Sequence, residues 1–281
     1  MTGFINVNKA AGASSAKEVA RIKKLTGTPC GHMGTLDPMA SGVLPVAIGN
    51  AARLFDYFLD KRKKYVATFL FGADSDTLDT TGSVLNNAGR VPALEEIEKV
   101  IPGFIGEVAQ IPPRYSAKNV AGKRGYELAR AGVDFELPPK TVKIYGIKVR
   151  KSLQENSFDF EIECGGGTYI RSIARDIAEK LDTCAIMSSL VRTQSGAFTI
   201  ENSVKSEELS QENIDKYIIP TEKLLPFDSI YPDPKQGFRL FNGIAVSCEK
   251  PDGTYKIYKD GLFYGLAEVK QSILRVRTKL C

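Results

Sequence analysis

The sequence is poor in the residues that most often bind metals or form cross-links. It has one histidine and five cysteines, and the cysteines lie far apart without any CxxC pair: Cys30, Cys164, Cys184, Cys248 and Cys281. No zinc-ligand set can be assembled from these residues at the usual spacings, so we expect no metal site. An odd number of scattered cysteines also argues against a disulfide framework. It favours the reducing environment of the cytoplasm.

Long apolar runs are absent as well. No stretch approaches the roughly 20 residues that a membrane helix needs, and the first ten residues, MTGFINVNKA, lack the apolar core of a signal peptide. We therefore expect no membrane association. The net charge of +5, from 38 basic and 33 acidic residues, is weak evidence for an anionic partner. With 281 residues, 43% of them hydrophobic, the chain is long enough for one large and one small globular domain.

The stretch around which the chain is organised runs from residue 31 to residue 55, GHMGTLDPMASGVLPVAIGNAARLF. It contains His32, and it contains Asp37 directly before a proline. Proline restricts the residue that precedes it, so Asp37 is expected in one extended pose within an irregular loop. The loop leads into a buried strand at 43–48 and a helix at 51–59. Such a loop can present a catalytic group, but an Asp-Pro pair alone more often only makes a turn.

The remaining periodicity predicts a mixed α+β fold. Period-2 alternation and apolar runs indicate strands at 3–9, 63–72, 104–110, 141–153, 156–164 and 188–200, and helical spacing indicates helices at 17–25, 92–101 and 168–181. The strand that carries Tyr65 is apolar on both faces, so we expect it at the centre of the sheet. Prolines at 220–234 mark a linker. We predict a catalytic domain at 1–224 and a small β-rich domain at 225–281, with 237–249 extended.

Arg171 breaks a local rule. Thr168 is a plausible N-cap for the helix at 168–181, which places Arg171 in the first turn, where the helix dipole disfavours a cation. Violations of this kind concentrate at functional sites. The alternatives are an arginine that points to water or one in a structural ion pair. We interpret Arg171 as the fixed partner of a carboxylate.

Two further segments carry many charged residues. Asp74, Asp76 and Asp79 resemble a calcium loop, but the glycine at position six and the glutamate at position twelve are missing, so we reject that reading. The segment at about 112–140 interleaves cations, among them Lys123 and Arg124, with tyrosines. Cations with interleaved aromatic residues favour a nucleic-acid surface over a plain solvated insertion.

Four of these stretches, in this order, resemble the tRNA pseudouridine-55 synthases of the TruB family. They are GHMGTLDPMASGVLPVAIGNAARLF, KKYVATFLFGADSDTLDTTG, PPRYSAKNVAGKRGYELARAG and GGGTYIRSIARDI. The resemblance spans most of the first 200 residues and departs from the family's usual residues at Ala10, Met33 and Ser75. It implies the pseudouridine synthase fold, with a central mixed, largely antiparallel sheet flanked by helices and loops. For residues 225–281 it implies a PUA-like module.

The resemblance also implies a reaction and a set of site residues. The enzyme would isomerise uridine 55 in the T arm stem-loop of tRNA to pseudouridine on a flipped-out base, without a cofactor and as a monomer. Asp37 matches the nucleophile and Arg171 its ion-pair partner. Tyr65 matches the tyrosine that stacks on the target base, and His32 a residue that braces the vacated space. Further substrate contacts are implied for Tyr169 and Leu190 at the pocket and for Lys9, Lys123 and Arg124 at RNA phosphates.

Two other classes of protein are alternatives to this enzyme. A non-catalytic RNA-binding or tRNA chaperone protein on the same fold would explain the basic insertion, but the trio of Asp37, Tyr65 and Arg171 argues against it. An aspartyl-phosphate phosphotransferase would need a DxD-type nucleophile motif, which the sequence Asp37-Pro38-Met39 does not supply.

Overall fold

A large sheet forms the body of the protein. The computed structural model describes residues 1–57, 62–116, 118–120 and 122–280. Ten strands form the sheet in the order β14-β1-β3-β12-β4-β11-β10-β7, with β13 on β12 and β2 on β3. The strands are β1 Gly3–Lys9, β2 Cys30–His32, β3 Ser41–Ile48, β4 Lys63–Phe71, β7 Gly106–Gln110, β10 Lys140–Lys151, β11 Ser157–Cys164, β12 Ala185–Ser195, β13 Phe198–Thr199 and β14 Val204–Lys205.

The sheet confirms the expected fold class. The pairs β1–β14 and β3–β12 are parallel, and the other pairs in this sheet are antiparallel. The strand β4 lies between β12 and β11, at the centre as predicted. Its alternate residues Tyr65, Ala67, Phe69 and Phe71 are buried, because this face of the sheet packs into the main hydrophobic core.

Three helices pack on this buried face: α1 Ser15–Thr26, α2 Leu94–Val100 and α4 Ile170–Lys180. Each contributes isoleucines to the main core, among them Ile22, Ile97 and Ile173. The helix α1, expected at 17–25, begins two residues earlier at Ser15, because the Ser14 side chain accepts a hydrogen bond from the Lys17 N–H. The space that these helices leave uncovered, between α4 and the loop after β2, holds the site described below.

Short elements connect these parts. They are β5 Ala73–Ser75, β6 Val84–Asn86, β8 Asn119–Val120, β9 Lys123–Arg124, α3 Gly125–Arg130, η2 Ile101–Phe104, η3 Ile200–Asn202, η4 Ser206–Glu208, η5 Ile214–Tyr217 and η6 Thr221–Leu224. The helix expected at 51–59 is instead a 3-10 helix, η1 Gly49–Tyr57, and residues 58 and 59 of that prediction lie outside the described residues. The helix expected from residue 92 begins at Leu94, and η2 continues it through Pro102.

A second, five-stranded sheet follows near the C-terminus, with the order β15-β17-β18-β19-β16. Its elements are β15 Ser229–Ile230, α5 Pro234–Phe241, β16 Val246–Ser247, β17 Gly253–Lys259, β18 Leu262–Lys270 and β19 Ile273–Lys279. The prediction of extended chain at 237–249 is wrong for its first part. Asp233 caps a helix there by accepting hydrogen bonds from Lys235 N and Gln236 N, and Pro234 occupies the first turn.

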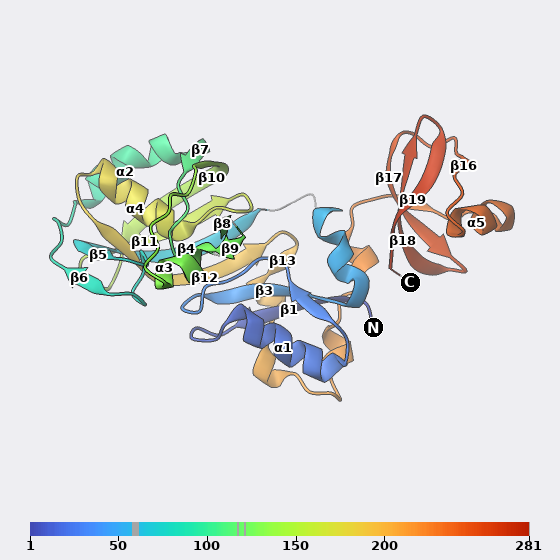
Figure 1. The fold of residues 1–281 in the computed structure, drawn as a ribbon, viewed down its shortest axis with the longest axis horizontal. Helices are drawn as coiled ribbons and strands as arrows, with labels where there is room; N and C mark the ends of the chain where they lie inside the picture. The colour runs from blue at the N-terminus through green and yellow to red at the C-terminus, as the bar shows by residue number, and fades with distance from the viewer. Residues whose placement is uncertain (58–61, 117, 121, 281) are drawn as a thin grey trace.

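A separate apolar cluster joins this sheet to the body. It consists of Leu54, Leu225, Leu266 and Leu280, all of them buried. In Figure 1, η1 lies between the large sheet and the C-terminal module. The division at 224/225 stays a prediction. Among the described residues, no helix is long and apolar enough to cross a membrane.

Candidate active site

The loop that carries Asp37 connects β2 to β3 and is fixed on both sides of the aspartate. Ser15 Oγ donates to Leu36 O at 2.8 Å and accepts from Leu36 N at 2.9 Å. The Ala40 N–H donates to Asp37 O at 3.0 Å, which closes a turn over Pro38. The Asp-Pro pair therefore does make a turn. The same turn presents the Asp37 carboxylate, whose side chain is about one-third exposed (34%).

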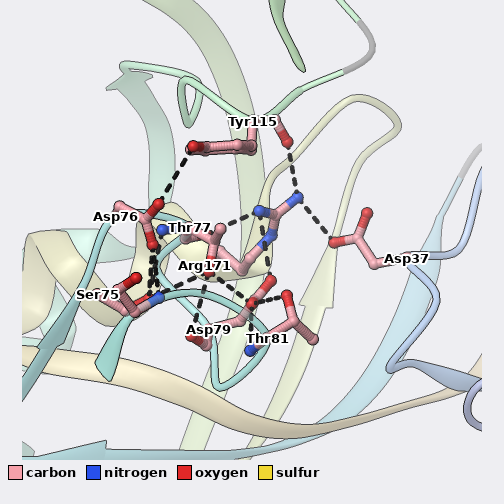
Figure 2. Close-up of polar contacts among 9 residues, drawn as sticks. Asp37, Ser75, Asp76, Thr77, Asp79, Thr81, Tyr115 and Arg171 are labelled. Atoms are coloured by element: carbon pink, nitrogen blue, oxygen red, sulfur yellow. Dashed lines mark hydrogen bonds and ion pairs between the residues drawn. The ribbon is translucent and has the colours of Figure 1, made fainter. Parts of the chain in front are cut away.

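Arg171 is the ion-pair partner of Asp37. Its Nη2 lies 2.9 Å from Asp37 Oδ2, so the predicted carboxylate partner is present. The guanidinium also donates to Thr77 O at 2.8 Å and to Tyr115 O at 3.1 Å, and its Nη1 lies 3.4 Å from Asp79 Oδ2. Figure 2 shows Arg171 between these groups. A buried cation needs such partners, and two carboxylates offset the unfavourable helix dipole in the first turn of α4.

Asp79 holds the other side of Arg171, and the sequence reasoning missed it. Its Oδ1 accepts hydrogen bonds from Thr77 Oγ1 at 2.8 Å, Thr81 N at 2.9 Å and Thr81 Oγ1 at 2.5 Å. Leu78, which lies between Thr77 and Asp79, has a φ of 60°, a backbone conformation that is strained for a branched side chain. The repeated Asp and Thr residues at 74–81 were the signal, but neither the calcium-loop comparison nor the family resemblance gave Asp79 a role. The Asp79 oxygens accept hydrogen bonds from N–H and O–H groups of the protein itself.

An inner cavity of about 470 Å³ opens beside this ion pair. Its walls include Lys63, Tyr65, Tyr169, Leu190 and both partners of the ion pair. Tyr65 projects from β4, and Leu190 from the neighbouring strand β12. Burial raises the pKa of the Tyr65 phenol, so Tyr65 is neutral at neutral pH. The site residues predicted at the pocket are therefore brought together.

Tyr169, not Thr168, is the N-cap residue of α4. Thr168 Oγ1 instead donates to Gly165 O at 3.0 Å. Both backbone polar groups of Tyr169 are bonded to the Gln110 side chain: its N–H donates to Gln110 Oε1 at 2.8 Å, and its carbonyl accepts from Nε2 at 3.1 Å. This clamp fixes the entry of α4, and hence the position of Arg171, against the end of β7.

An outer cavity of about 750 Å³ lies on the other side of Asp37. Its walls include His32, Asp37, Tyr115, Tyr126 and Arg130. His32 ends β2, where burial lowers the pKa of its imidazole, and its buried Nδ1 has no hydrogen-bond partner among the described residues. The imidazole is therefore neutral at neutral pH. Its role as a brace stays a prediction.

The predicted phosphate contact of Lys9 is wrong for this structure. The side chain is fully buried, and its ammonium donates to the carbonyl oxygens of Ala10 at 2.9 Å, Ala13 at 2.7 Å and Pro38 at 3.2 Å. All three N–H groups are thereby used. Burial lowers the pKa of Lys9. Lys9 instead ties the end of β1 to the residue after Asp37.

Arg192 was also missed, although it is fully buried on β12. Its Nε donates to Val43 O at 2.7 Å, its Nη2 to Gly34 O at 3.0 Å and its Nη1 to Thr35 O at 3.5 Å. It thus binds the backbone on both sides of the Asp37 turn. The signal was its position two residues after Leu190, on the same inward face of a strand.

Lys123 and Arg124, predicted to contact phosphates, lie apart from the inner cavity. They form the exposed strand β9 at the tip of a small hairpin in the insertion. The Arg124 N–H donates to Glu127 Oε2 at 3.0 Å, at the start of α3. Their contact with RNA stays a prediction. Among the residues that the structure describes, no group of three or more His, Cys, Asp or Glu residues could hold a metal ion.

Two family models match the chain in succession. The TruB family pseudouridylate synthase (N terminal domain) matches residues 19–170, and the tRNA pseudouridylate synthase B C-terminal domain matches residues 171–226. Curated relatives match the chain over nearly its whole length. The tRNA pseudouridine synthase B of Clostridium novyi is 39% identical over the whole of both chains, and that of Clostridium tetani is 38% identical over 95% of this chain and 96% of its own.

Solved structures resemble the whole chain. The Cbf5-Nop10-Gar1 complex contains a chain that is 27% identical, with a TM-score of 0.71, and the similarity covers 99% of this chain and 85% of that one. The archaeal box H/ACA sRNP Nop10-Cbf5 complex contains another at 25% identity and a TM-score of 0.69, covering 99% of this chain and 86% of that one.

Proposed function

The chain belongs to the TruB family of pseudouridylate synthases and is a tRNA pseudouridine synthase, and we propose that it isomerises uridine 55 in the T arm with Asp37 as its nucleophile. The observation that carries this proposal is the ion pair between Asp37 and Arg171 in the wall of the inner cavity. A carboxylate paired with a fixed guanidinium, beside a cavity that can hold a base, is the arrangement that the reaction needs.

The reaction moves uracil from its N1 to its C5. The C1′–N1 bond breaks, a C1′–C5 bond forms, the proton on C5 is lost and N1 gains one, so substrate and product are isomers. No oxidant, phosphate donor or water is consumed. The nucleophile Asp37 forms a transient bond to the sugar or to the base, and Arg171 orients its carboxylate before the substrate arrives.

The inner cavity receives the flipped base. Tyr65 stacks on the uracil, and Leu190 and Tyr169 enclose it, because their side chains line the same space as Asp37. A stacked base cannot reach this depth. The nucleotide therefore leaves its stack, at a cost of a few kcal/mol that its contacts in the cavity repay.

The outer cavity and the insertion bind the RNA strand. Tyr115, Tyr126 and Arg130 line that cavity, and Lys123 and Arg124 add two exposed cations from the same insertion. His32 braces the space that the flipped base leaves. The catalytic unit comprises residues 1–224 and the PUA-like module residues 225–281, and the protein works as a monomer in the cytoplasm.

The test uses an unmodified T-arm hairpin and a pseudouridine-specific chemical readout. Asp37→Asn removes the nucleophile and keeps the shape of the side chain, so product formation is lost and the hairpin still binds. Asp215→Asn, at an exposed aspartate on η5, is the matched control and retains activity. Turnover near the wild-type rate in Asp37→Asn would sink the assignment. A wild-type protein that binds the hairpin without modifying it would favour the non-catalytic alternative.

A further inference from the structure

Lys63 is a cation in the inner cavity that the proposed roles above do not use. It begins β4, two residues before Tyr65, so both side chains lie on the same face of the strand, roughly 7 Å apart along it. Lys63 is half-buried and lines the cavity together with Asp37. Its Nζ lies close to the loop of the nucleophile: a Cβ added at Gly34 would be 3.1 Å from it.

The surroundings of Lys63 are short of negative charge. Among the described residues, no carboxylate lies within ion-pair distance of its ammonium. The groups that face it are the Arg192 guanidinium from β12 and the Cys164 thiol from β11. Burial raises the pKa of Cys164 to about 11, so this thiol is neutral and balances no charge. Lys63 and Arg192 are neighbouring cations, and no ion pair with a carboxylate is found for either within the part of the chain that the structure describes, so this end of the cavity attracts an anion.

A base fits this position better than a phosphate does. The cavity that Lys63 lines has largely apolar walls, with Tyr65 next to Lys63 on β4 and with Leu190 and Met187 further along the neighbouring strand β12. A phosphate keeps its full charge and hydration throughout the reaction, so taking it into such walls is costly. Uracil enters as a neutral ring and becomes charged only during the reaction. A preorganised cation is most effective toward charge that develops in the transition state.

We propose that Lys63 is a catalytic residue whose ammonium donates a hydrogen bond to a uracil oxygen and stabilises the negative charge of the detached base. The inference rests on the proposed function. When the C1′–N1 bond breaks, both of its electrons go to the uracil, and the charge is shared among N1, O2 and O4. The charge disappears when C5 bonds to C1′, its proton leaves and N1 is protonated. Lys63 gains and loses no covalent bond in this sequence.

The first test is Lys63→Met, assayed on the T-arm hairpin under single-turnover conditions. The rate constant of the chemical step should fall on the order of 100-fold, while the Kd of the hairpin stays within about threefold, because the lost interaction exists mainly in the transition state. Lys64→Met is the matched control. Lys64 is exposed and follows Lys63 in β4 on the opposite face, so this variant removes the same charge and keeps the wild-type rate.

Two outcomes would overturn the proposal while the wild-type protein still makes pseudouridine. An unchanged rate in Lys63→Met would show that the ammonium takes no part in the chemistry. A loss confined to the Kd, with a shallower dependence of binding on salt, would identify a phosphate contact instead. A wild-type protein that makes no pseudouridine would instead refute the proposed function.

The pH profile gives a readout that does not depend on the folding of a variant. Burial and Arg192 lower the pKa of Lys63 to about 8, so the ammonium is present below that pH and is lost above it. The wild-type kcat/KM should therefore fall about tenfold between its plateau and pH 9. Lys63→Arg stays charged and should flatten this decline, with Tyr65, Asp37 and Arg171 unchanged around it. A flat wild-type profile from pH 7 to 9 would contradict the proposal.

Discussion

At the scale of single residues, Arg171 is held by two carboxylates, those of Asp37 and Asp79, and by two backbone carbonyls. The ion pair of Asp37 with Arg171 could be predicted, because a cation in a first helical turn breaks a local rule. Asp79 and Arg192 were missed, because each acts through contacts with residues far away in the sequence. Lys9 was wrongly placed at the RNA. Nothing local in the sequence reveals that three carbonyl groups surround its ammonium.

The buried side of Arg171 supplies a prediction at this scale. Asp79→Asn removes one of the two carboxylates and leaves Arg171 held by Asp37 and two carbonyls. Because the guanidinium loses a charged partner and gains freedom, the chemical step should slow by about tenfold. Breaking the buried pair should also cost about 3 kcal/mol of stability. Single-turnover rates and urea unfolding measure the two effects.

Asp74→Asn is the control for that variant. Asp74 lies on β5, just before the turn that carries Asp79, is exposed and accepts a hydrogen bond from Ser75 N, and no contact with Arg171 is found for it. Its rate should equal that of the wild type. Equal rates in Asp79→Asn as well would mean that Asp37 and the two carbonyls suffice to orient the guanidinium.

At the scale of elements, the insertion is tied to Arg171 at its base and is exposed at its tip. Tyr115 O accepts from Arg171, and Tyr115 OH donates to Asp76 Oδ2 at 3.1 Å. Ser172 Oγ, the next residue on α4, donates to Ile111 O at 2.9 Å. The segment stands out in the sequence by its cations and tyrosines. The ties at its base could not be predicted, since they join parts of the chain more than 35 residues apart.

The exposed tip supplies a prediction about RNA binding. Lys123→Ala combined with Arg124→Ala removes two cations from β9. RNA binding should weaken, and the slope of log affinity against log salt should become shallower by up to about two, because fewer counterions are released. The unfolding midpoint should stay unchanged. Filter binding at several salt concentrations and thermal unfolding provide these measurements.

A double variant with the same loss of charge serves as control. Lys216 and Lys223 are exposed and line neither cavity, so Lys216→Ala with Lys223→Ala should leave the slope as it is. Affinity lost equally in both double variants would trace the effect to net charge. Affinity retained in the Lys123 and Arg124 variant would remove the insertion from the binding surface.

At the scale of the whole molecule, the fold class was predictable and the arrangement was not. Alternation identified most strands of the large sheet, and the double apolar face placed β4 at its centre. The strand order, with β12 between β3 and β4, depends on pairings across more than 100 residues that no local pattern specifies. The prediction for the start of the C-terminal module was wrong. Asp233 and Pro234 begin a helix there, and the apolar residues of that helix are spaced in the sequence much as those of a strand would be.

The leucine cluster between the body and the C-terminal module supplies a prediction about the stability of the protein. Leu266 on β18 is fully buried against Leu54 of η1, so Leu266→Ala should destabilise the protein by about 2–5 kcal/mol. The rate of pseudouridine formation by the folded protein should not change, since none of the four leucines of this cluster lines the inner cavity. Urea unfolding followed by activity at low temperature separates the two quantities. Leu262→Ala, on the same strand but 72% exposed, should cost less than about 0.5 kcal/mol.

The position of Asp37 between two cavities has a consequence for which uridines react. In the proposed function, an RNA held in the outer cavity would deliver its flipped base to Asp37 as an intramolecular reactant, at an effective concentration set by a few ångströms of backbone. A free nucleoside reaches the inner cavity only at its bulk concentration. With the proposed function, the shared wall would convert strand binding into selectivity, and we expect free uridine to be left unmodified.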